Sequence, residues 1–306
     1  MGKKSRRKTD LPVYTIKTFQ RRPGSVHFEM GTMEENAGTF SFASTPHRHD
    51  CFFIMFVTQG SGKHTIDGQQ YPIKRYACFL MLPGQVHSWT FSEDIKGFYF
   101  HFTLEFYKSY VRERHIEKFP YLRMLTLDSY VQFDPKLEQG LEAMITDMYA
   151  EFNGRKTGWE DILRNSLDSM LIRMARYCRS DVTIQGSLST VTHIRSLQSL
   201  IERHFYELKL PSDYAKMMNV TPKHLNSMCK SALNKTVTEL IQERTIVEAK
   251  RHLAYTEKTI KQIATELGFS DLSYFMRYFK KQTKGTPDQF RKSVRYVKSV
   301  EVEGIL

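Results

Sequence analysis

The C-terminal third of the 306-residue chain contains a degenerate internal repeat, and this repeat constrains the fold more than any other feature. The first copy consists of Ala215, Asn219, Val220, Thr221, Leu225, Cys229, Lys230, Asn234, Thr236 and Leu240. The second copy consists of Ala264, Gly268, Phe269, Ser270, Phe275, Phe279, Lys280, Lys284, Thr286 and Phe290. From Cys229 and Phe279 onward the spacings are identical, and one extra residue separates Ser270 from Phe275. Two copies are too few for a solenoid, so the repeat indicates a duplicated small module.

The second copy reads as two short amphipathic helices joined by a tight turn. Thr259 and Gln262 form a capping-box pattern that opens a helix over 260–267. Gly268 ends this helix, because glycine adopts left-handed backbone without a steric penalty. Either Ser270 or Asp271 then caps the next helix.

The first copy has the same organisation. Pro211 suits the start of a helix, and Asn219 takes the place of Gly268 because asparagine tolerates left-handed backbone. Ala215 and Ala264 are small enough for the two helices of each copy to cross closely. This pattern is typical of the helix-turn-helix, and it predicts an all-α domain with motifs at 211–233 and 260–282.

The exposed face of the second helix in each motif is the candidate nucleic-acid surface. Arg277 is suited to a bidentate pair with guanine, and lysines further along the helix suit phosphate groups. The predicted base contacts are Lys223, His224, Asn226, Ser227, Ser273, Met276 and Arg277. The predicted phosphate contacts are Thr221, Lys230, Lys280 and Lys281. Taken singly, each of these residues also fits an ordinary solvated helix face.

The positive charge of the chain is concentrated in the same region. The net charge is +12, and residues 188–298 hold 20 basic and 10 acidic residues. Residues 11–187 are balanced, whereas residues 1–10 form a basic tail. Clustered positive charge is typical of a protein that binds a polyanion. Together with the repeat and its turn residues, it favours DNA as the partner.

Residues 263–291 resemble the signature of the AraC/XylS-type transcription regulators. The matching positions are Ile263, Ala264, Gly268, Phe269, Ser273, Tyr274, Phe275, Arg277, Phe279, Lys280, Thr286, Pro287, Phe290 and Arg291. Upstream, the residues over 237–253 are similar to the helix that joins the two motifs in that family; they include Arg244, Ala249, Lys250 and Leu253. The resemblance implies a double-stranded DNA-binding domain over 188–295, followed by a tail over 296–306.

The sequence departs from this family at two places. Lys284 stands where the family usually has glycine, and Gly285 follows one place later. We therefore expect the turn after the second recognition helix to be shifted by one residue. Ser227 stands where many relatives have a longer polar side chain, which weakens the prediction that the first motif reads bases.

Residues 11–134 predict a small β-barrel. From about residue 40 to residue 104, short alternating segments are separated by turn sequences, and residues 64–73 form a clear hairpin around Asp67-Gly68. Short strands at this spacing are typical of a barrel or sandwich. The stretches His47-Arg48-His49-Asp50 and 83–87 make the region similar to the cupin-like sensor domain of the same regulators. That similarity implies a small-molecule effector in the barrel.

Three histidines in this region match metal ligands of cupin enzymes. His47, His49 and His87 fit the pattern, but Phe53 stands where those enzymes have a carboxylate. A phenylalanine there removes the anionic ligand and fills the space with an apolar ring, so we expect no metal ion and no cofactor. Instead, His47, His49, Phe53 and His87 are candidate effector-pocket residues, with the histidines hydrogen-bonded to polar groups at the barrel mouth.

Residues 135–184 change to helical periodicity. One apolar stripe comprises Leu137, Leu141, Met144, Ile145 and Met148, and a second comprises Ile162, Leu163, Leu167, Met170, Leu171 and Met174. The pair resembles the family's dimerisation hairpin, which implies a homodimer. Packing of both stripes on their own barrel explains the pattern equally well. A linker follows at 185–187.

The predicted architecture is therefore an α+β multidomain chain: a cupin-like β-barrel with a helical hairpin, followed by the all-α domain. We predict a cytoplasmic, effector-controlled transcription regulator that is not an enzyme, with RNA polymerase as a further partner if it activates. The longest apolar run, residues 51–57, is too short to cross a membrane. The four scattered cysteines predict reduced, mostly buried thiols.

Two other function classes compete with this prediction. One is a cupin metalloenzyme with an accessory basic domain, and Phe53 argues against it. The other is an architectural or RNA-binding protein without a ligand. No RNP-like strand of aromatic and basic residues supports RNA binding.

Overall fold

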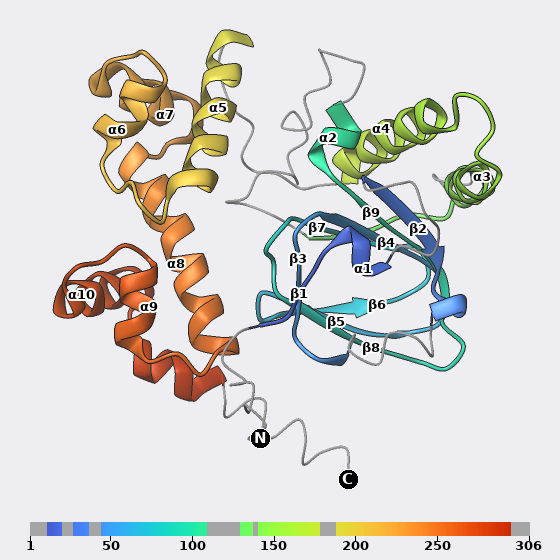
Figure 1. Cartoon of the computed structure of the whole chain (residues 1–306), viewed down its shortest axis with the longest axis horizontal. Helices are drawn as coiled ribbons and strands as arrows, with labels where there is room; N and C mark the ends of the chain where they lie inside the picture. The colour runs from blue at the N-terminus through green and yellow to red at the C-terminus, as the bar shows by residue number, and fades with distance from the viewer. Residues whose placement is uncertain are drawn as a thin grey trace, which may run out of the picture. The chain divides into compact units, whose positions relative to one another are not determined.

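A computed structural model of the chain describes residues 11–19, 27–36, 44–108, 129–136, 140–177 and 188–294. The chain divides into two compact units, of which one covers Pro12–Asp181 and the other continues from Val182. The described strands lie in the first unit, and the described part of the second is helical (Figure 1). The predicted tails over 1–10 and 296–306 and the predicted linker lie outside the described residues.

The N-terminal unit consists mainly of short strands. In chain order its elements are β1 (Val13–Tyr14), α1 (Ile16–Phe19), β2 (Phe28–Thr32), the 3-10 helix η1 (Glu34–Asn36), β3 (Arg48–His49), β4 (Phe52–Gln59), β5 (Gly62–Ile66), β6 (Gln69–Ile73), β7 (Ala77–Met81), β8 (His87–Phe91), β9 (Lys96–Phe102), α2 (Leu104–Lys108), β10 (Tyr130–Gln132), α3 (Leu141–Gly154) and α4 (Trp159–Tyr177). A five-stranded sheet has the order β10-β7-β4-β9-β2, and a three-stranded sheet has the order β6-β5-β8. β1 and β3 pair in parallel.

Both faces of β4 are buried, which explains the long apolar run at residues 51–57. Successive side chains of a strand point to opposite faces of the sheet. Phe53 and Met55 therefore join an apolar layer with residues of β5 and β6, whereas Ile54 and Phe56 join the core that includes α3 and α4. A strand buried on both faces needs no polar alternation.

The cupin-like barrel predicted from the sequence is built from separate sheets, and no single closed cylinder is present among the described strands. Their ladders join strands within each sheet, and an isolated bridge between His47 and His87 connects the β3 region to β8. Side chains from both sheets, such as Ile66 and Phe79, fill one shared apolar layer. Burial across two sheets, rather than a continuous hydrogen-bonded cylinder, encloses this core.

The predicted hairpin is confirmed in β5 and β6. Ile66 pairs with Gln69, so Asp67 and Gly68 alone form the turn. Their φ angles are 49° and 86°. A two-residue turn of type I′ requires positive φ at both positions, and asparagine or aspartate followed by glycine supplies it at the lowest cost.

The helices α3 and α4 cover the face of the five-stranded sheet that carries Ile54 and Phe56 (Figure 1). Their buried side chains are Leu141, Ile145, Met148, Phe152, Leu163, Leu167, Met170, Leu171 and Met174. Of the two explanations that the sequence leaves open for the apolar stripes, packing on the chain's own sheet is therefore observed. Ile162, in α4, remains 47% exposed.

The C-terminal unit is built around one long helix, α8 (Val237–Tyr255). The other helices are α5 (Leu188–His204), α6 (Pro211–Met217), α7 (Pro222–Leu233), α9 (Ile260–Glu266) and α10 (Leu272–Thr283), and residues 287–294 are also helical. α6 and α7 lie near one end of α8, and α9 and α10 near the other (Figure 1). Each pair forms a helix-turn-helix, so the duplicated module is confirmed.

The turns inside the two motifs have the predicted left-handed backbone. The φ angle is 54° at Asn219 and 79° at Gly268. A Cβ atom at Gly268 would lie 2.0 Å from the carbonyl oxygen of Tyr206. Gly268 is therefore required both by its conformation and by the close approach of neighbouring backbone.

The turn after α10 differs from the prediction. Lys284 itself has a φ of 65° and ends α10, just as Asn234, with a φ of 54°, ends α7. The turn is therefore not shifted to Gly285. Thr286 and Gln289 explain this, because their side chains and backbone N–H groups bond reciprocally and cap the following helix. A shift of one residue would break that cap.

A buried ion network joins α5 to α8. Arg244 Nη2 donates to Glu202 Oε1 over 2.9 Å, and Arg244 Nη1 donates to Glu248 Oε2 over 3.1 Å. Glu248 Oε2 also accepts from Arg251 Nη1 over 3.0 Å. The Arg244 guanidinium lies 4.0 Å from the ring centroid of Phe205. Arg244 is therefore a structural residue of the joining helix.

Cys51, Cys78 and Cys229 are buried thiols, as the sequence predicts, and Cys178 lies outside the described residues.

In the part of the chain that the structure describes, no helix combines the length and hydrophobicity needed to span a bilayer.

Candidate nucleic-acid interface and ligand site

α7 and α10 are structural equivalents whose residue numbers differ by 50. Residues 221–230 and 271–280 have the same degree of burial at every position. Leu225 and Phe275 are fully buried, and so are the residues one helical turn later. Thr221 and Asp271 cap the two helices with side-chain oxygens. Of the two caps considered for α10, Asp271 is therefore the one used.

The exposed face of α10 brings together most of the predicted contacts of the second motif. Ser273, Arg277, Lys280 and Lys281 are exposed, and Met276 is half-buried at the edge of this face. Arg277 lies in the middle of the helix, and the two lysines lie in its last turn. Lysines near a helix C-terminus are also favoured by the helix dipole, so their position alone does not indicate phosphate contact.

The exposed face of α7 has a different chemistry at the equivalent positions. Lys223, His224, Ser227 and Lys230 are exposed. The short Ser227 replaces the long, charged side chain of Arg277. α7 therefore presents its cations near its two ends, whereas α10 presents one at its centre.

Asn226 lies at the edge of this face and also bonds to the backbone of the next helix. It is half-buried, and its Oδ1 atom accepts a hydrogen bond from the backbone N–H of Val237 over 3.1 Å. The amide oxygen is thereby committed to the start of α8. The Nδ2 atom is the part of this side chain that is suited to an acceptor on a base.

Tyr274 is a further candidate for the interface that the prediction of DNA contacts did not include. It occupies the position equivalent to His224, at the start of α10, and it is 55% exposed. Its ring lies 6.0 Å from that of Phe269 and 6.5 Å from that of Tyr278. The repeat contains the signal, because Tyr274 is the counterpart of the predicted contact His224.

A cluster of histidines lies inside the N-terminal unit. The backbones of His47 and His87 bond to each other, with N–O distances of 3.0 and 2.9 Å. His49 follows on β3, His64 lies on β5, and His101 lies on β9 directly opposite Phe53. The strand register therefore directs histidines from four segments towards one interior region.

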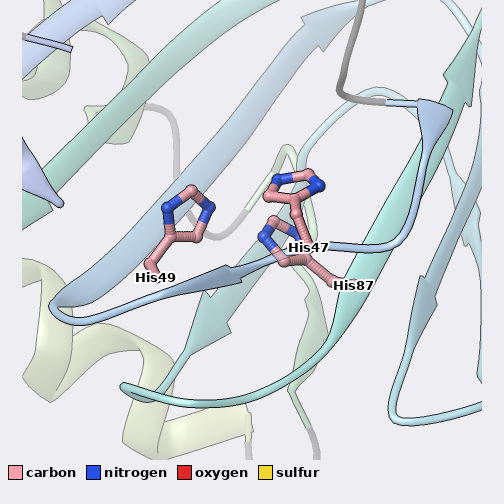
Figure 2. A group of neighbouring side chains, drawn as sticks. All are labelled: His47, His49 and His87. Atoms are coloured by element: carbon pink, nitrogen blue, oxygen red, sulfur yellow. The ribbon is translucent and has the colours of Figure 1, made fainter. Parts of the chain in front are cut away.

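Three of these histidines bring their ring nitrogens together. One ligand atom from each of His47, His49 and His87 lies within 4.8 Å of the others (Figure 2). All three residues are at most 3% exposed. We expected these histidines at the barrel mouth, hydrogen-bonded to polar groups; instead the surrounding strands and α1 enclose them. Both nitrogens of His49 and the Nε2 atom of His87 have no hydrogen-bond partner among the described residues.

Burial keeps these imidazoles neutral. It lowers the pKa of His47, and it lowers the pKa values of His49 and His87 well below the ordinary value of 6.5, with neighbouring histidines adding to the effect. Burial, and secondly the electrostatic interaction with His47, lowers the pKa of His64 and of His101 to about 3. The cluster therefore offers nitrogen lone pairs at neutral pH rather than positive charge.

Phe53 packs beside the cluster. Its ring stacks on that of His49, with the centroids 5.2 Å apart and the planes inclined by 13°. It also lies 4.6 Å from the ring of His101. The four candidate pocket residues His47, His49, Phe53 and His87 are thus brought together by the fold.

Two models of protein domains match the chain. A helix-turn-helix domain matches residues 214–293, and an AraC-like ligand binding domain matches residues 34–167. The first matched segment covers most of the two helix-turn-helix motifs, and the second covers most of the strand-rich unit.

Similar full-length proteins include regulators of transcription. The uncharacterized HTH-type transcriptional regulator YfiF of Bacillus subtilis is 23% identical over 255 residues, which are 80% of this chain and 78% of that protein. The HTH-type transcriptional activator RhaR of Mannheimia succiniciproducens is 22% identical, over 82% of this chain and 88% of that protein. Among solved structures, fatty-acid-bound ToxT from Vibrio cholerae is 16% identical with a TM-score of 0.38, covering 88% of this chain and 96% of that chain.

Proposed function

The chain belongs to the AraC-type family of DNA-binding transcription regulators, with a ligand-binding domain in its N-terminal half, and from this premise we propose how it engages DNA. α7 and α10 enter two successive major-groove segments on one face of the duplex. The base contacts are Lys223, His224, Asn226, Ser227, Ser273, Met276 and Arg277. The phosphate contacts are Thr221, Lys230, Lys280 and Lys281.

One observation carries this proposal: the shared burial pattern of residues 221–230 and 271–280. It leaves the same face of each second helix uncovered, and that face is rich in basic and polar side chains. Arg277 at the centre of α10 has the geometry for a bidentate pair with guanine, whereas Ser227 in α7 can make one hydrogen bond. The second motif therefore contributes more sequence preference than the first.

The length of α8 supports simultaneous use of both motifs. This helix has 19 residues and at 1.5 Å per residue it is about 28 Å long. Successive major-groove segments on one face of B-DNA are about 34 Å apart. A rigid connector of this size suits two recognition helices spaced by about one helical turn.

The N-terminal unit supplies the control in this proposal. A small-molecule effector binds near His47, His49, Phe53 and His87 and changes how the two motifs engage DNA. The buried polar cluster supports this site, because polar atoms enclosed by an apolar layer fix the orientation of a ligand. We assign binding rather than catalysis to this unit.

Three further elements of the proposal concern partners and location. The exposed side of α4, where Ile162 lies, serves as a homodimer contact, since its buried side already packs on the sheet. RNA polymerase is an additional partner if the protein activates transcription. We also assign the protein to the cytoplasm.

Selection of binding sites from random duplexes by the full-length chain tests the proposal. We expect one recurrent site and a footprint with two protected segments about ten base pairs apart. Arg277→Ala should relax the preference at one base pair, whereas Lys63→Ala, an exposed lysine of the N-terminal unit, should leave the selected site unchanged. Recovery of no common site would contradict the proposal.

A further inference from the structure

We propose that His47, His49 and His87 form a binding site for a divalent transition-metal ion such as Zn²⁺. The three imidazoles come from two segments far apart in the sequence and converge inside the N-terminal unit (Figure 2). This inference rests on their geometry and is independent of how the chain binds DNA. It reverses the expectation, drawn from Phe53 alone, that the unit holds no metal.

The backbone holds the three ligands in a defined arrangement. His47 and His87 form a reciprocal pair of backbone hydrogen bonds, and their ring centroids are 4.2 Å apart. His49 follows His47 by two residues on an extended segment, so its side chain returns to the same face. Its ring centroid lies 5.1 Å from that of His47 and 4.8 Å from that of His87.

Outer contacts already orient two of the rings as ligands. His47 Nδ1 lies 2.8 Å from the carbonyl oxygen of Thr45, to which it must donate, so the lone pair of this ring is on Nε2. His87 Nδ1 lies 3.0 Å from His64 Nε2, and this contact leaves His87 Nε2 directed elsewhere. Metal-binding histidines typically use one nitrogen for the ion and the other for such an outer partner.

The remaining nitrogens need a partner that the described side chains do not provide. Both nitrogens of His49 and the Nε2 atom of His87 are buried and make no hydrogen bond with the described residues. Leaving a buried polar atom unsatisfied costs about 1–3 kcal/mol. A metal ion accepts one lone pair from each ring, so a single ion would satisfy His87 Nε2 and one nitrogen of His49, and the other His49 nitrogen keeps its N–H.

Phe53 does not obstruct the ion in the way the sequence suggests. Its ring lies nearly parallel to that of His49, with an angle of 13° between the planes. It therefore covers the face of the imidazole, whereas the lone pairs of an imidazole lie in the plane of the ring. Phe53 removes an anionic ligand from the set, but it leaves the three nitrogens accessible to one another.

The required adjustment is small, and the donor set defines the class of ion. Tetrahedral Zn²⁺ with Zn–N bonds of about 2.0–2.1 Å places its nitrogens about 3.3 Å apart, compared with the limit of 4.8 Å between the three ligand atoms here. Small rotations of the rings close this difference. Three neutral imidazoles suit Zn²⁺, Fe²⁺, Co²⁺, Ni²⁺ or Cu²⁺, and the fourth position remains for water or an anionic group.

Titration of the full-length, tag-free, metal-depleted chain with Co²⁺ tests this site. Tetrahedral Co²⁺ has intense visible absorption, and Zn²⁺ should displace it. We expect about one ion per chain and a higher melting temperature of the N-terminal unit with metal than without. His49→Gln and His87→Gln should each weaken Co²⁺ binding by at least about tenfold.

His27→Gln is the matched control, because this exposed histidine lies in the same unit but outside the cluster, and it should leave the Co²⁺ titration unchanged. Absence of stoichiometric Co²⁺ or Zn²⁺ binding by the folded wild-type chain, verified by its melting transition, overturns the proposal. Unchanged affinity in both glutamine variants overturns the assignment of the ligands. The wild-type titration decides the question even if a variant fails to fold.

Discussion

The side-chain oxygen of Asn226 accepts a hydrogen bond from the backbone N–H of Val237 over 3.1 Å, and so joins the first recognition helix to the start of α8. Val237 is fully buried, so its N–H group has no access to water. In the second copy, Met276 and Pro287 stand at the equivalent positions. Proline has no N–H group. Met276 therefore has no backbone donor to satisfy, and an apolar side chain can take the place of Asn226.

This relationship predicts a coupled pair of substitutions. Asn226→Met should lower the free energy of unfolding of the C-terminal unit by about 1–3 kcal/mol, because it leaves a buried N–H unpaired. Adding Val237→Pro should restore most of that loss, since proline suits the first position of a helix. Thr236 before it already has the extended backbone (φ −81°, ψ 159°) that a following proline favours.

Urea denaturation of the wild type, both single variants and the double variant measures the coupling energy. Strictly additive effects of the two substitutions would show that the hydrogen bond does not link these positions.

Gly268→Ala should unfold or strongly destabilise the second motif. The new Cβ would meet the Tyr206 carbonyl oxygen at 2.0 Å, and the backbone has a φ of 79°. We expect a loss of about 2–4 kcal/mol in the free energy of unfolding. Gly285→Ala is the control, because its Cβ would have Gln289 Oε1 as nearest neighbour at 3.7 Å. Similar losses in both variants, measured by thermal denaturation, would contradict this account of the turn.

Glu248→Gln should destabilise the C-terminal unit by about 3–5 kcal/mol, because it removes the charge that Arg244 and Arg251 share in a buried environment. Glu243→Gln on the same helix is the control. Its partner Lys235 is 33% exposed, and such a surface pair contributes about 0–1 kcal/mol. If the two variants have equal melting temperatures, the buried network does not stabilise the joint between α5 and α8.

Most of the C-terminal unit could be predicted from the sequence because its signals are local. Gly268, Asn219 and the Thr259 capping box each define a helix end through nearby backbone geometry. Lys284 is the exception. Its left-handed conformation is imposed by the cap that Thr286 and Gln289 form after it, and a search for glycine overlooks such a constraint.

The N-terminal unit was harder to predict because its key relationships are long-range. The sequence identifies the strands and the Asp67-Gly68 hairpin, but the division into two sheets depends on which strands pair. The pattern of His47, His49 and His87 identified three histidines of the cluster, but it missed His64 and His101, which strand pairing brings to the same interior region. Their complete burial, and the stacking of Phe53 on the face of His49, follow from packing that no spacing in the sequence reports.

Arg277 and Lys281 of α10 should contribute differently to DNA binding. Arg277→Ala should cost about 1–3 kcal/mol on the selected site and relax the preference at one base pair, because it removes a bidentate base contact. Lys281→Ala should weaken binding to all sequences alike and reduce the slope of log K against log salt by about one unit. Titrations at several salt concentrations separate the two effects. Equal, sequence-independent losses would show that Arg277 contacts phosphate alone.

Affinity for a site with altered spacing tests most directly whether both motifs bind DNA together. Insertion of about five base pairs between the two half-sites rotates one of them by half a helical turn. Because α8 connects the two motifs as a single helix, α7 and α10 cannot then reach both half-sites on one face. We predict loss of high-affinity binding by the full-length chain in an electrophoretic mobility shift titration. Unchanged affinity for the altered site would contradict the account and show that a single motif binds DNA.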